Sequence, residues 1–357
     1  MNGKLKIREI ALQTGLSIST VSRVLAGKAN TSEQAKQKIL DCARQEGILE
    51  HMSTGRLLLN SLVVFAPQRA FDARSDIFYF KVIQGIAQAL APHEVRLRYC
   101  AIEEENSNTA LFMEKMNDPA TEAAMLVGID DPIIYGLAAN IGKPCILINC
   151  RDRRMQLPGV SPDHQLIGRF SAQYLFEQGH RRILSILCLR RYTMEQRLNG
   201  IREAWQECNL QFDESRHLII TQGFGASETE QSLTEYLRQY PEHERPTAIL
   251  AGGDFMAQGA INALSGFGLH VPHDISIMSM DGFDATTDHQ VPFTSVQVPC
   301  CELGMEAVRL LQQWLMRPNM ISRTLLLNGG LILRNSVRRI NSHKISPLTQ
   351  EFGLYDA

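Results

Sequence analysis

Residues 7–25 read IREIALQTGLSISTVSRVL, and this stretch predicts two short helices joined by a tight turn. Gly15 suits the turn, because glycine enters the left-handed backbone region without strain. Ser17 can cap the second helix, since its hydroxyl can accept a hydrogen bond from an amide of the first turn. Apolar residues recur at helical spacing on both sides of the turn: Ile7, Ile10, Ala11, Val21, Val24 and Leu25. The pattern is typical of a helix-turn-helix, whose second helix enters the major groove of DNA.

Residues 14–28, TGLSISTVSRVLAGK, closely resemble the DNA-binding head of the lactose/galactose repressor (LacI/GalR) family. The resemblance implies that Ile18, Ser19 and Arg23 read base edges. An arginine can bind guanine with two hydrogen bonds, and an isoleucine can pack on a thymine methyl group. Thr20 and Ser22 can hold phosphates, although ordinary polarity of a helix surface would also explain them.

The charge of the chain is unevenly distributed. The formal net charge is −2, yet residues 1–60 contain nine Lys/Arg and five Asp/Glu, and the remainder carries a net −6. A basic head on a mildly acidic body fits a phosphate-binding module attached to a regulatory domain. Residues 31–46 predict a third helix, capped by Thr31 or Ser32 and ended by Gly47. We therefore expect a three-helix DNA-binding head at 1–50 and a hinge at 51–61.

The hinge has two interpretations. In the family, this link becomes a short helix on DNA and wedges a leucine into the minor groove, and Leu57 matches that leucine. The wedge unstacks a base step, and wider contact with bent DNA offsets the cost. Gly55 weakens such a helix by roughly 1 kcal/mol relative to alanine. Alternatively, residues 57–59 simply lead into the first strand of the body.

From residue 62 onward, short apolar runs alternate with amphipathic helices. Leu62–Ala66, ended by Pro67, is typical of a buried parallel strand. Further strands are expected at 95–101, 123–128, 145–149, 183–187, 217–221, 247–251, 275–280 and 324–328. Helices are expected at 78–91, 109–117, 133–141, 165–178, 195–208, 226–240, 254–267 and 302–316. This alternation predicts an α/β fold of two doubly wound lobes at 62–340, followed by a polar tail at 341–357.

The body also resembles the LacI/GalR family and, through it, the periplasmic sugar-binding proteins. Six stretches carry the resemblance in order: 176–183 (FEQGHRRI), 197–204 (RLNGIREA), 246–249 (PTAI), 253–259 (GDFMAQG), 274–283 (DISIMSMDGF) and 302–307 (ELGMEA). The resemblance spans roughly residues 5–340 and implies an effector-binding cleft between the two lobes.

The positions that match the family's effector residues carry aromatic and hydrogen-bonding side chains. They are Phe78, Tyr79, Asn149, Arg191, Thr193, Arg197, Phe224, Asp254 and Asp281. Such groups suit a sugar, which needs hydrogen-bonding partners and an aromatic face. The family usually has aspartate at Asn149, and Asn or Ser at Gly253. Arg151, Arg190, Arg191 and Arg197 make this part of the sequence cationic, which hints at an acidic or phosphorylated sugar unless some of them are solvated surface charges.

Other function classes are not indicated. The eight cysteines form no Cys-x-x-Cys pair and have no accompanying histidine cluster, so no metal site is expected. Most of them lie in apolar runs, where cysteine behaves as a small buried hydrophobic residue. A reducing compartment is therefore the simpler interpretation. No export signal and no membrane-spanning apolar run is visible. The chain contains no P-loop, Gly-x-Ser-x-Gly or His-Glu-x-x-His motif, so neither catalysis nor a cofactor is expected.

Together these features predict a cytoplasmic transcriptional regulator of the repressor type, controlled by a small carbohydrate-like effector. The resemblance implies a homodimer on palindromic double-stranded operator DNA, because such sites require two-fold symmetry. The tail has no heptad pattern, so a leucine-zipper tetramer is not expected. The alternative is a periplasmic-type solute-binding protein without DNA regulation, which would need a signal peptide and lack the basic head.

Overall fold

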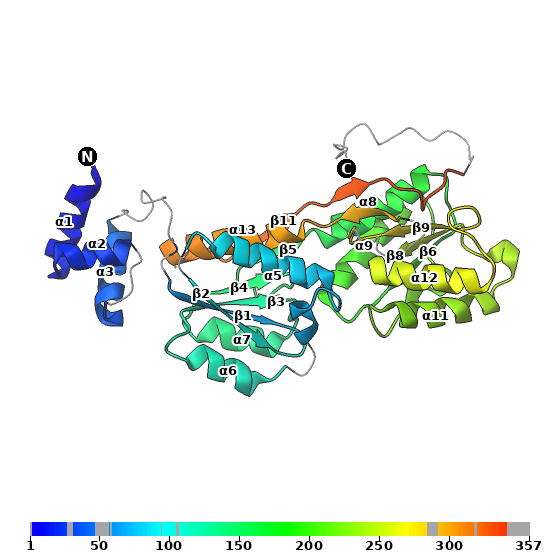
Figure 1. Ribbon diagram of the computed structural model, residues 1–357. Helices are drawn as coiled ribbons and strands as arrows, with labels where there is room; N and C mark the ends of the chain where they lie inside the picture. Colours follow the sequence, from blue (N-terminus) through cyan, green and yellow to red (C-terminus); the bar gives the residue numbers. More distant parts are fainter. Residues whose placement is uncertain are drawn as a thin grey trace. The chain divides into compact units, whose positions relative to one another are not determined.

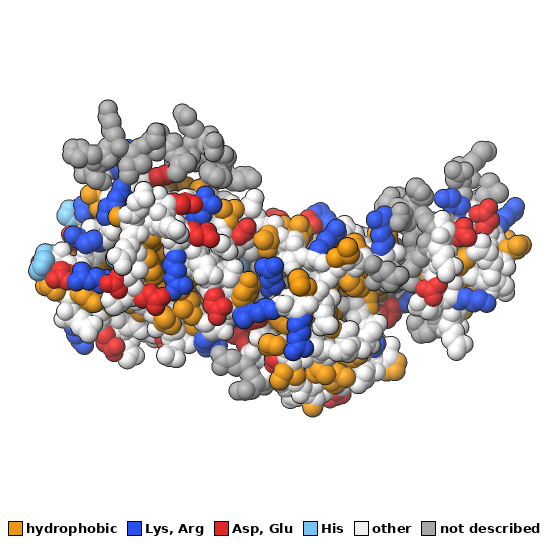
Figure 2. Space-filling view, turned by 180° about the vertical axis from the view of Figure 1, so that it is seen from behind, with side chains coloured by type: hydrophobic (Ala, Val, Ile, Leu, Met, Phe, Trp, Pro, Cys, Tyr) orange, Lys and Arg blue, Asp and Glu red, His pale blue; other side chains and the backbone are white. Residues whose placement is uncertain are grey.

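The computed structural model describes residues 2–26, 31–46, 57, 59–93, 95–104, 107–283, 292–317 and 320–340. The chain divides into two compact units: unit 1 comprises residues 1–160 and 300–325, and unit 2 comprises residues 161–299 and 326–357. The chain therefore passes from one unit to the other three times. Among the described residues, no helix is both long and apolar enough to cross a membrane. On the face shown in Figure 2, Lys/Arg and Asp/Glu side chains are interspersed over the surface.

The head consists of the three predicted helices, α1 (Asn2–Thr14), α2 (Ile18–Leu25) and α3 (Glu33–Gln45) (Figure 1). Gly15 has a φ of 69°, in the left-handed region that the turn requires. The Ser17 hydroxyl accepts a 3.1 Å hydrogen bond from the amide of Thr20, which confirms the predicted cap. Apolar side chains from all three helices form the core of the head: Ile10, Ala11, Val21, Val24, Leu25, Ile39, Leu40, Cys42 and Ala43.

Unit 1 is built on a six-stranded sheet with the order β11-β5-β4-β3-β1-β2. Five parallel strands are β1 (Ser61–Ala66), β2 (Arg96–Ala101), β3 (Ala123–Val127), β4 (Cys145–Ile148) and β5 (Gly159–Pro162), and β11 is Thr324–Leu327. A short 3-10 helix, η1 (Gln68–Phe71), follows β1. Helices α5 (Ile77–Leu90) and α13 (Cys300–Met316) cover one face, and α6 (Thr109–Asn117) and α7 (Pro132–Asn140) cover the other (Figure 1).

The two helices α5 and α13 pack so closely that only glycine fits at two contact positions. A Cβ added at Gly85 would lie 2.0 Å from the Cys301 carbonyl oxygen. A Cβ added at Gly304 would lie 2.2 Å from the Val82 carbonyl oxygen. The C-terminal segment that contains α13 is therefore an integral part of unit 1.

Unit 2 holds a second six-stranded sheet with the order β12-β10-β9-β8-β6-β7. Its strands are β6 (Ile183–Leu187), β7 (Leu218–Ile220), β8 (Ala248–Ala251), β9 (Ser276–Ser279), β10 (Thr294–Gln297) and β12 (Gly330–Ile332), of which β12 pairs antiparallel with β10. Helices α8 (His164–Glu177) and α9 (Tyr192–Glu207) pack together, as do α11 (Ala226–Gln239) and α12 (Asp254–Gly266) (Figure 1). Short helices are α10 (Glu214–His217) and η2 (Glu242–Glu244).

The predicted α/β alternation is confirmed, with three strands missed. The sequence analysis did not predict β5, β10 or β12. β5 spans only four residues and includes Gly159 and Pro162, so no apolar run marks it. Helix α9 begins at Tyr192, three residues earlier than expected, which places Thr193 on the helix. Of the expected hinge at 51–61, residues 51–56 and 58 lie outside the described residues, as does the tail at 341–357.

A buried histidine links the start of β8 to the C-terminal segment of unit 2. His180 is fully buried, with Nδ1 3.0 Å from the Thr247 hydroxyl and Nε2 3.1 Å from the Arg338 carbonyl oxygen. Burial, helped by the charges of Arg338 and Arg181, lowers the pKa of His180 to about 4. The folded protein therefore holds this ring neutral at pH values where the unfolded chain would protonate it.

We expect unit 2 to lose stability as the pH falls from about 6.5 toward about 4, because only the unfolded state then takes up the proton. The contribution of His180 should be roughly 2–3 kcal/mol over that interval. Urea unfolding at pH 7, 6, 5 and 4.5 measures it in the wild type and in His180→Gln. The variant should be less stable at pH 7 but depend less on pH. Parallel pH profiles would show that His180 is not the titrating group.

Candidate DNA-binding and effector sites

Helix α2 presents most of the predicted DNA-binding residues on one exposed side. Its buried side is Val21, Val24 and Leu25, whereas Ile18, Ser19, Ser22 and Arg23 are exposed. Ile18, at the start of the helix, is 50% exposed, so its side chain is accessible to a partner. Arg23 extends along the same side, and its Nε donates a 3.3 Å hydrogen bond to the Ser19 carbonyl oxygen.

Thr20 has a different role in the head. Its amide is the donor to the Ser17 cap, and its hydroxyl lies 2.8 Å from Ser17 Oγ. It is only half-exposed, so it supports the start of α2. The Ser19 hydroxyl also lies 2.8 Å from Ser17 Oγ, so both Ser19 and Thr20 contact the cap of α2.

Leu57 lies inside unit 1. Its side chain is 1% exposed, and its amide donates a 3.2 Å hydrogen bond to His93 Nδ1. Leu59 is buried as well, and Asn60 donates from its amide and side chain to Glu122 Oε1. This placement agrees with the alternative in which the leucines lead into β1. For Leu57 to wedge into a minor groove, it would have to leave this buried position.

In unit 2, the predicted effector residue Arg197 forms hydrogen bonds through all three nitrogens of its guanidinium group. It lies on α9, and its side chain is 1% exposed. Its Nη2 donates to Asp281 Oδ1 at 3.0 Å, its Nη1 donates to the Gly252 carbonyl oxygen, and its Nε donates to His164 Nδ1 at 3.1 Å. The guanidinium thus joins α8, α9 and the segments that follow β8 and β9. The Asp281 side chain, by contrast, retains 21% exposure.

Asp254 fixes the turn that carries Asp281. One of its carboxylate oxygens accepts a hydrogen bond from the Ser279 hydroxyl, and the other accepts one from the Phe283 amide at 2.6 Å. Burial and the neighbouring Asp281 carboxylate raise the pKa of Asp254 to about 6. Because Asp254 is buried and both of its carboxylate oxygens accept hydrogen bonds, Asp281 is the more accessible acceptor of the two.

Two neighbouring arginines of unit 2, Arg190 and Arg191, lie close to the ring of Phe224. The Arg191 guanidinium lies 5.1 Å from the centre of the Phe224 ring, and that of Arg190 lies 6.0 Å from it. Arg190 also donates to the Gln222 carbonyl oxygen at 3.3 Å. Thr193 is buried near the start of α9, and its hydroxyl has no hydrogen-bond partner among the described residues. All these groups follow the carboxyl ends of parallel strands, where open α/β sheets bind ligands.

In unit 1, the predicted residues also gather at the carboxyl ends of the strands, but two of them point inward. Tyr79 is 2% exposed, and its ring packs closely on Gly128. A Cβ added at Gly128 would lie 2.3 Å from Cζ of the ring. Its hydroxyl accepts a 2.9 Å hydrogen bond from Asn149 Nδ2, and Asn149 is buried with a φ of 56°. Phe78 is only half-buried. The structure therefore leaves Phe78 as the more accessible aromatic side chain of the two.

Four residues outside the predicted effector set form hydrogen bonds or ion pairs close to it: His164, Arg69, Asp76 and Glu104. His164 accepts from Arg197 in unit 2. In unit 1, Arg69 binds Glu104 through both Nη atoms and Asp76 through Nε. A lone histidine at a helix start carries no signal in a single sequence. The predicted cationic cluster is also reduced, because Asp281 offsets the charge of Arg197.

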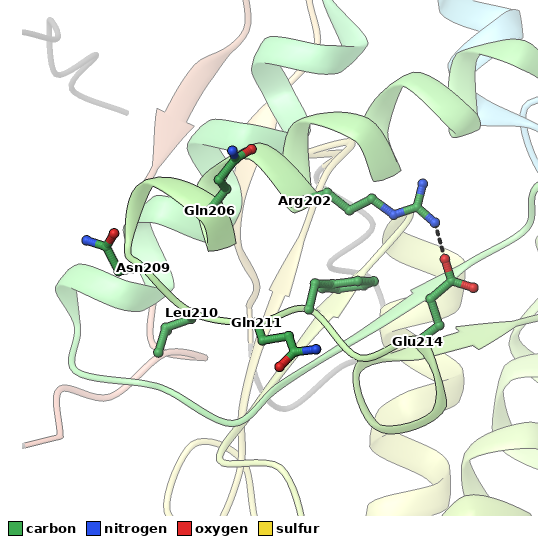
Figure 3. A pocket seen from close by; sticks show the side chains of 7 residues that line it. Arg202, Gln206, Asn209, Leu210, Gln211 and Glu214 are labelled. Atoms are coloured by element: carbon green, nitrogen blue, oxygen red, sulfur yellow. Dashed lines mark hydrogen bonds and ion pairs between the residues drawn. The ribbon is translucent and has the colours of Figure 1, made fainter.

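A separate surface pocket lies at the C-terminal end of α9 (Figure 3). Arg202 points across it toward Glu214, with which it forms an ion pair. The pocket is lined by Arg202, Gln206, Asn209, Leu210, Gln211, Phe212 and Glu214. None of these is a predicted effector residue, so this pocket and the predicted effector residues occupy different parts of α9.

Known protein families match both the head and the α/β body of the chain. The model for bacterial regulatory proteins of the lacI family matches residues 6–47, and that for a periplasmic binding protein-like domain matches residues 172–337. The HTH-type transcriptional repressor CytR of Escherichia coli (strain K12) is 26% identical over 339 residues, covering 94% of this chain and 96% of that protein.

Two solved structures share the fold. The complex of the transcriptional regulator CelR with cellobiose has a TM-score of 0.68 at 24% identity, covering 92% of this chain and 99% of that chain. The lac repressor dimer bound to operator and the anti-inducer ONPF has a TM-score of 0.66 at 17% identity, covering 92% of this chain and 98% of that chain.

A helix-turn-helix head joined to two α/β units defines a DNA-binding transcriptional regulator that responds to a small molecule, and not an enzyme. The chain thus carries a DNA-binding segment that matches the lacI family of bacterial regulatory proteins, followed by a periplasmic binding protein-like domain. The alternative of a solute-binding protein without DNA regulation is therefore wrong, because the head matches the family's own DNA-binding segment.

Proposed function

We propose that this chain is a cytoplasmic repressor that binds a palindromic operator as a homodimer, and that a sugar-like effector changes its affinity for DNA. The observation that carries the DNA-binding part is the exposed side of α2, where Ile18, Ser19 and Arg23 lie opposite the buried stripe. A helix with a buried side for packing and an exposed side with an arginine and an isoleucine can read a major groove. Two-fold symmetry of the dimer would match the two halves of the operator.

The effector is an uncharged, hydroxyl-bearing molecule. Asp281 supports this choice, because its partly exposed carboxylate can accept hydrogen bonds from hydroxyl groups. Phe78 and Phe224 are partly buried rings that can cover the apolar face of a sugar. A neutral ligand fits better than an acidic one, since Arg197 already bonds to Asp281 and Arg69 to Glu104. Binding then shifts operator affinity by as much as the effector prefers one conformation of the repressor over the other.

Replacing Arg23 with alanine tests the DNA-binding part. The operator is first selected from a random DNA library with the wild-type protein. Arg23→Ala should weaken binding to that operator by roughly 1–3 kcal/mol and reduce discrimination at the base pair it reads. Binding to random DNA should change much less, because phosphate contacts dominate there.

Arg8→Ala is the matched control, since Arg8 is an exposed arginine of the same head on α1. It removes the same charge without touching the proposed reading helix. If Arg23→Ala and Arg8→Ala weaken operator and random DNA equally, Arg23 does not read bases.

A further inference from the structure

Two residues outside the predicted set hold the Asp281 carboxylate in place. The first is His164, which acts through Arg197. Arginine has only donors, so His164 Nδ1 must accept the hydrogen bond from Arg197 Nε, and the neutral ring carries its proton on Nε2. Burial and the charge of Arg197 hold the pKa of His164 well below its usual value, which keeps this acceptor available. The fixed guanidinium then donates to Asp281 Oδ1.

The second residue is Gly253, which acts by having no side chain. A Cβ added at Gly253 would lie 2.3 Å from Asp281 Oδ2, whereas the next atoms, Cγ and Oδ1 of the same side chain, lie at 3.3 Å and 4.0 Å. The φ of Gly253 is −175°, extended backbone that any residue can adopt. The single obstacle to a side chain here is therefore the end of the Asp281 carboxylate, which would have to move.

We propose that His164 and Gly253 are positioning residues for effector binding, because together they set where the Asp281 carboxylate accepts a hydrogen bond from the effector. The inference rests on the proposed function, in which Asp281 contacts the effector. A preorganised acceptor gives more affinity than one that must be ordered on binding. It also selects the ligand: a hydroxyl or amine directed at Asp281 is bound, whereas a carbonyl oxygen at the same place is repelled.

The test uses the full chain and a panel of neutral monosaccharides, disaccharides and nucleosides. The member that raises the wild-type melting temperature most becomes the probe, and calorimetry gives its Kd for each variant. Gly253→Ala is compared with Gly266→Ala, because both lie at the ends of α12 and a Cβ at Gly266 meets nothing within 4 Å. His164→Leu, which removes the acceptor, is compared with His164→Asn, whose side-chain oxygen can replace Nδ1. Asp281→Asn reports whether the probe uses Asp281 at all.

We expect Gly253→Ala and His164→Leu to raise the Kd about ten- to a hundredfold, the size of losing one hydrogen bond to a charged acceptor. Gly266→Ala and His164→Asn should stay within about threefold of wild type. The melting temperature of Gly253→Ala should be close to wild type, since only a carboxylate end moves. In the Asp281→Asn background, Gly253→Ala should have no further effect on the Kd.

The outcomes separate the two proposals. A probe that needs Asp281 but binds Gly253→Ala and His164→Leu as tightly as wild type overturns this inference alone. A panel without a single binder, or a probe indifferent to Asp281→Asn, overturns the proposed effector class and the inference with it. If His164→Leu does not fold, the Kd values of Gly253→Ala and Gly266→Ala decide whether the inference holds. Equal Kd values for these two variants would overturn it.

Discussion

Replacing Arg197 with alanine is expected to abolish the response to the effector and to destabilise unit 2 by roughly 3–5 kcal/mol. The side chain is 1% exposed, and three of its nitrogens donate to His164, Gly252 and Asp281. Its removal leaves a partly buried carboxylate and a buried carbonyl without their donor, and such groups are costly. Urea unfolding measures the loss of stability, and operator binding with and without the effector measures the response.

Arg202→Ala is the matched control, because Arg202 lies on the same helix and pairs with Glu214 at the surface. The two side chains are 41% and 63% exposed, so solvent screens the pair and its loss should cost at most about 1 kcal/mol. A stability of Arg197→Ala within that range would mean that the buried contacts of Arg197 contribute little. An unchanged response would remove Arg197 from the effector machinery.

Replacing Leu57 with alanine is expected to destabilise unit 1 by roughly 2–5 kcal/mol, because the side chain is buried and the change leaves a cavity. Unfolding of the free protein measures this cost. The same variant also answers whether Leu57 serves as a minor-groove wedge. Operator affinity and the DNA bend angle are therefore measured at one salt concentration, since wedging and bending are one energetic event.

Leu59→Ala is the control for that experiment, since Leu59 is also buried but does not match the wedge position. A smaller DNA bend with Leu57→Ala, but not with Leu59→Ala, would mean that Leu57 has two positions. It would be buried in unit 1 when the protein is free, and inserted into the minor groove when the protein is bound to DNA. Equal bends in both variants and wild type would leave Leu57 in the body alone. A Leu57→Ala protein as stable as wild type would contradict the burial described here.

The sequence predicts the fold well where a strand is a continuous apolar run. Leu62–Ala66 is such a run, and β1 begins only one residue earlier. The short β5, with Gly159 and Pro162, owes its strand form to backbone pairing with β4, and no pattern in its own residues shows that. Local pattern therefore finds the strands in the middle of each sheet more readily than those that tertiary pairing creates.

The candidate effector site shows the same difference between what local sequence and what packing determine. Resemblance to the family indicates Arg197 and Asp281, and the structure joins them by a 3.0 Å bond. It does not indicate His164, because the contact depends on how α8 packs against α9. Nor can spacing decide which of the adjacent rings Phe78 and Tyr79 turns inward, since both begin α5. That choice depends on the space above Gly128.

The order in which the chain is synthesised follows from the division of unit 1 into two segments. Helix α13, which packs on α5 through Gly85 and Gly304, is translated only after the whole of unit 2 up to Pro299. Until then, α5 lacks the helix that packs against it, and the face of the sheet that α5 and α13 share is only partly covered. A product terminated within unit 2 therefore exposes apolar surface and becomes a substrate for chaperones and proteases.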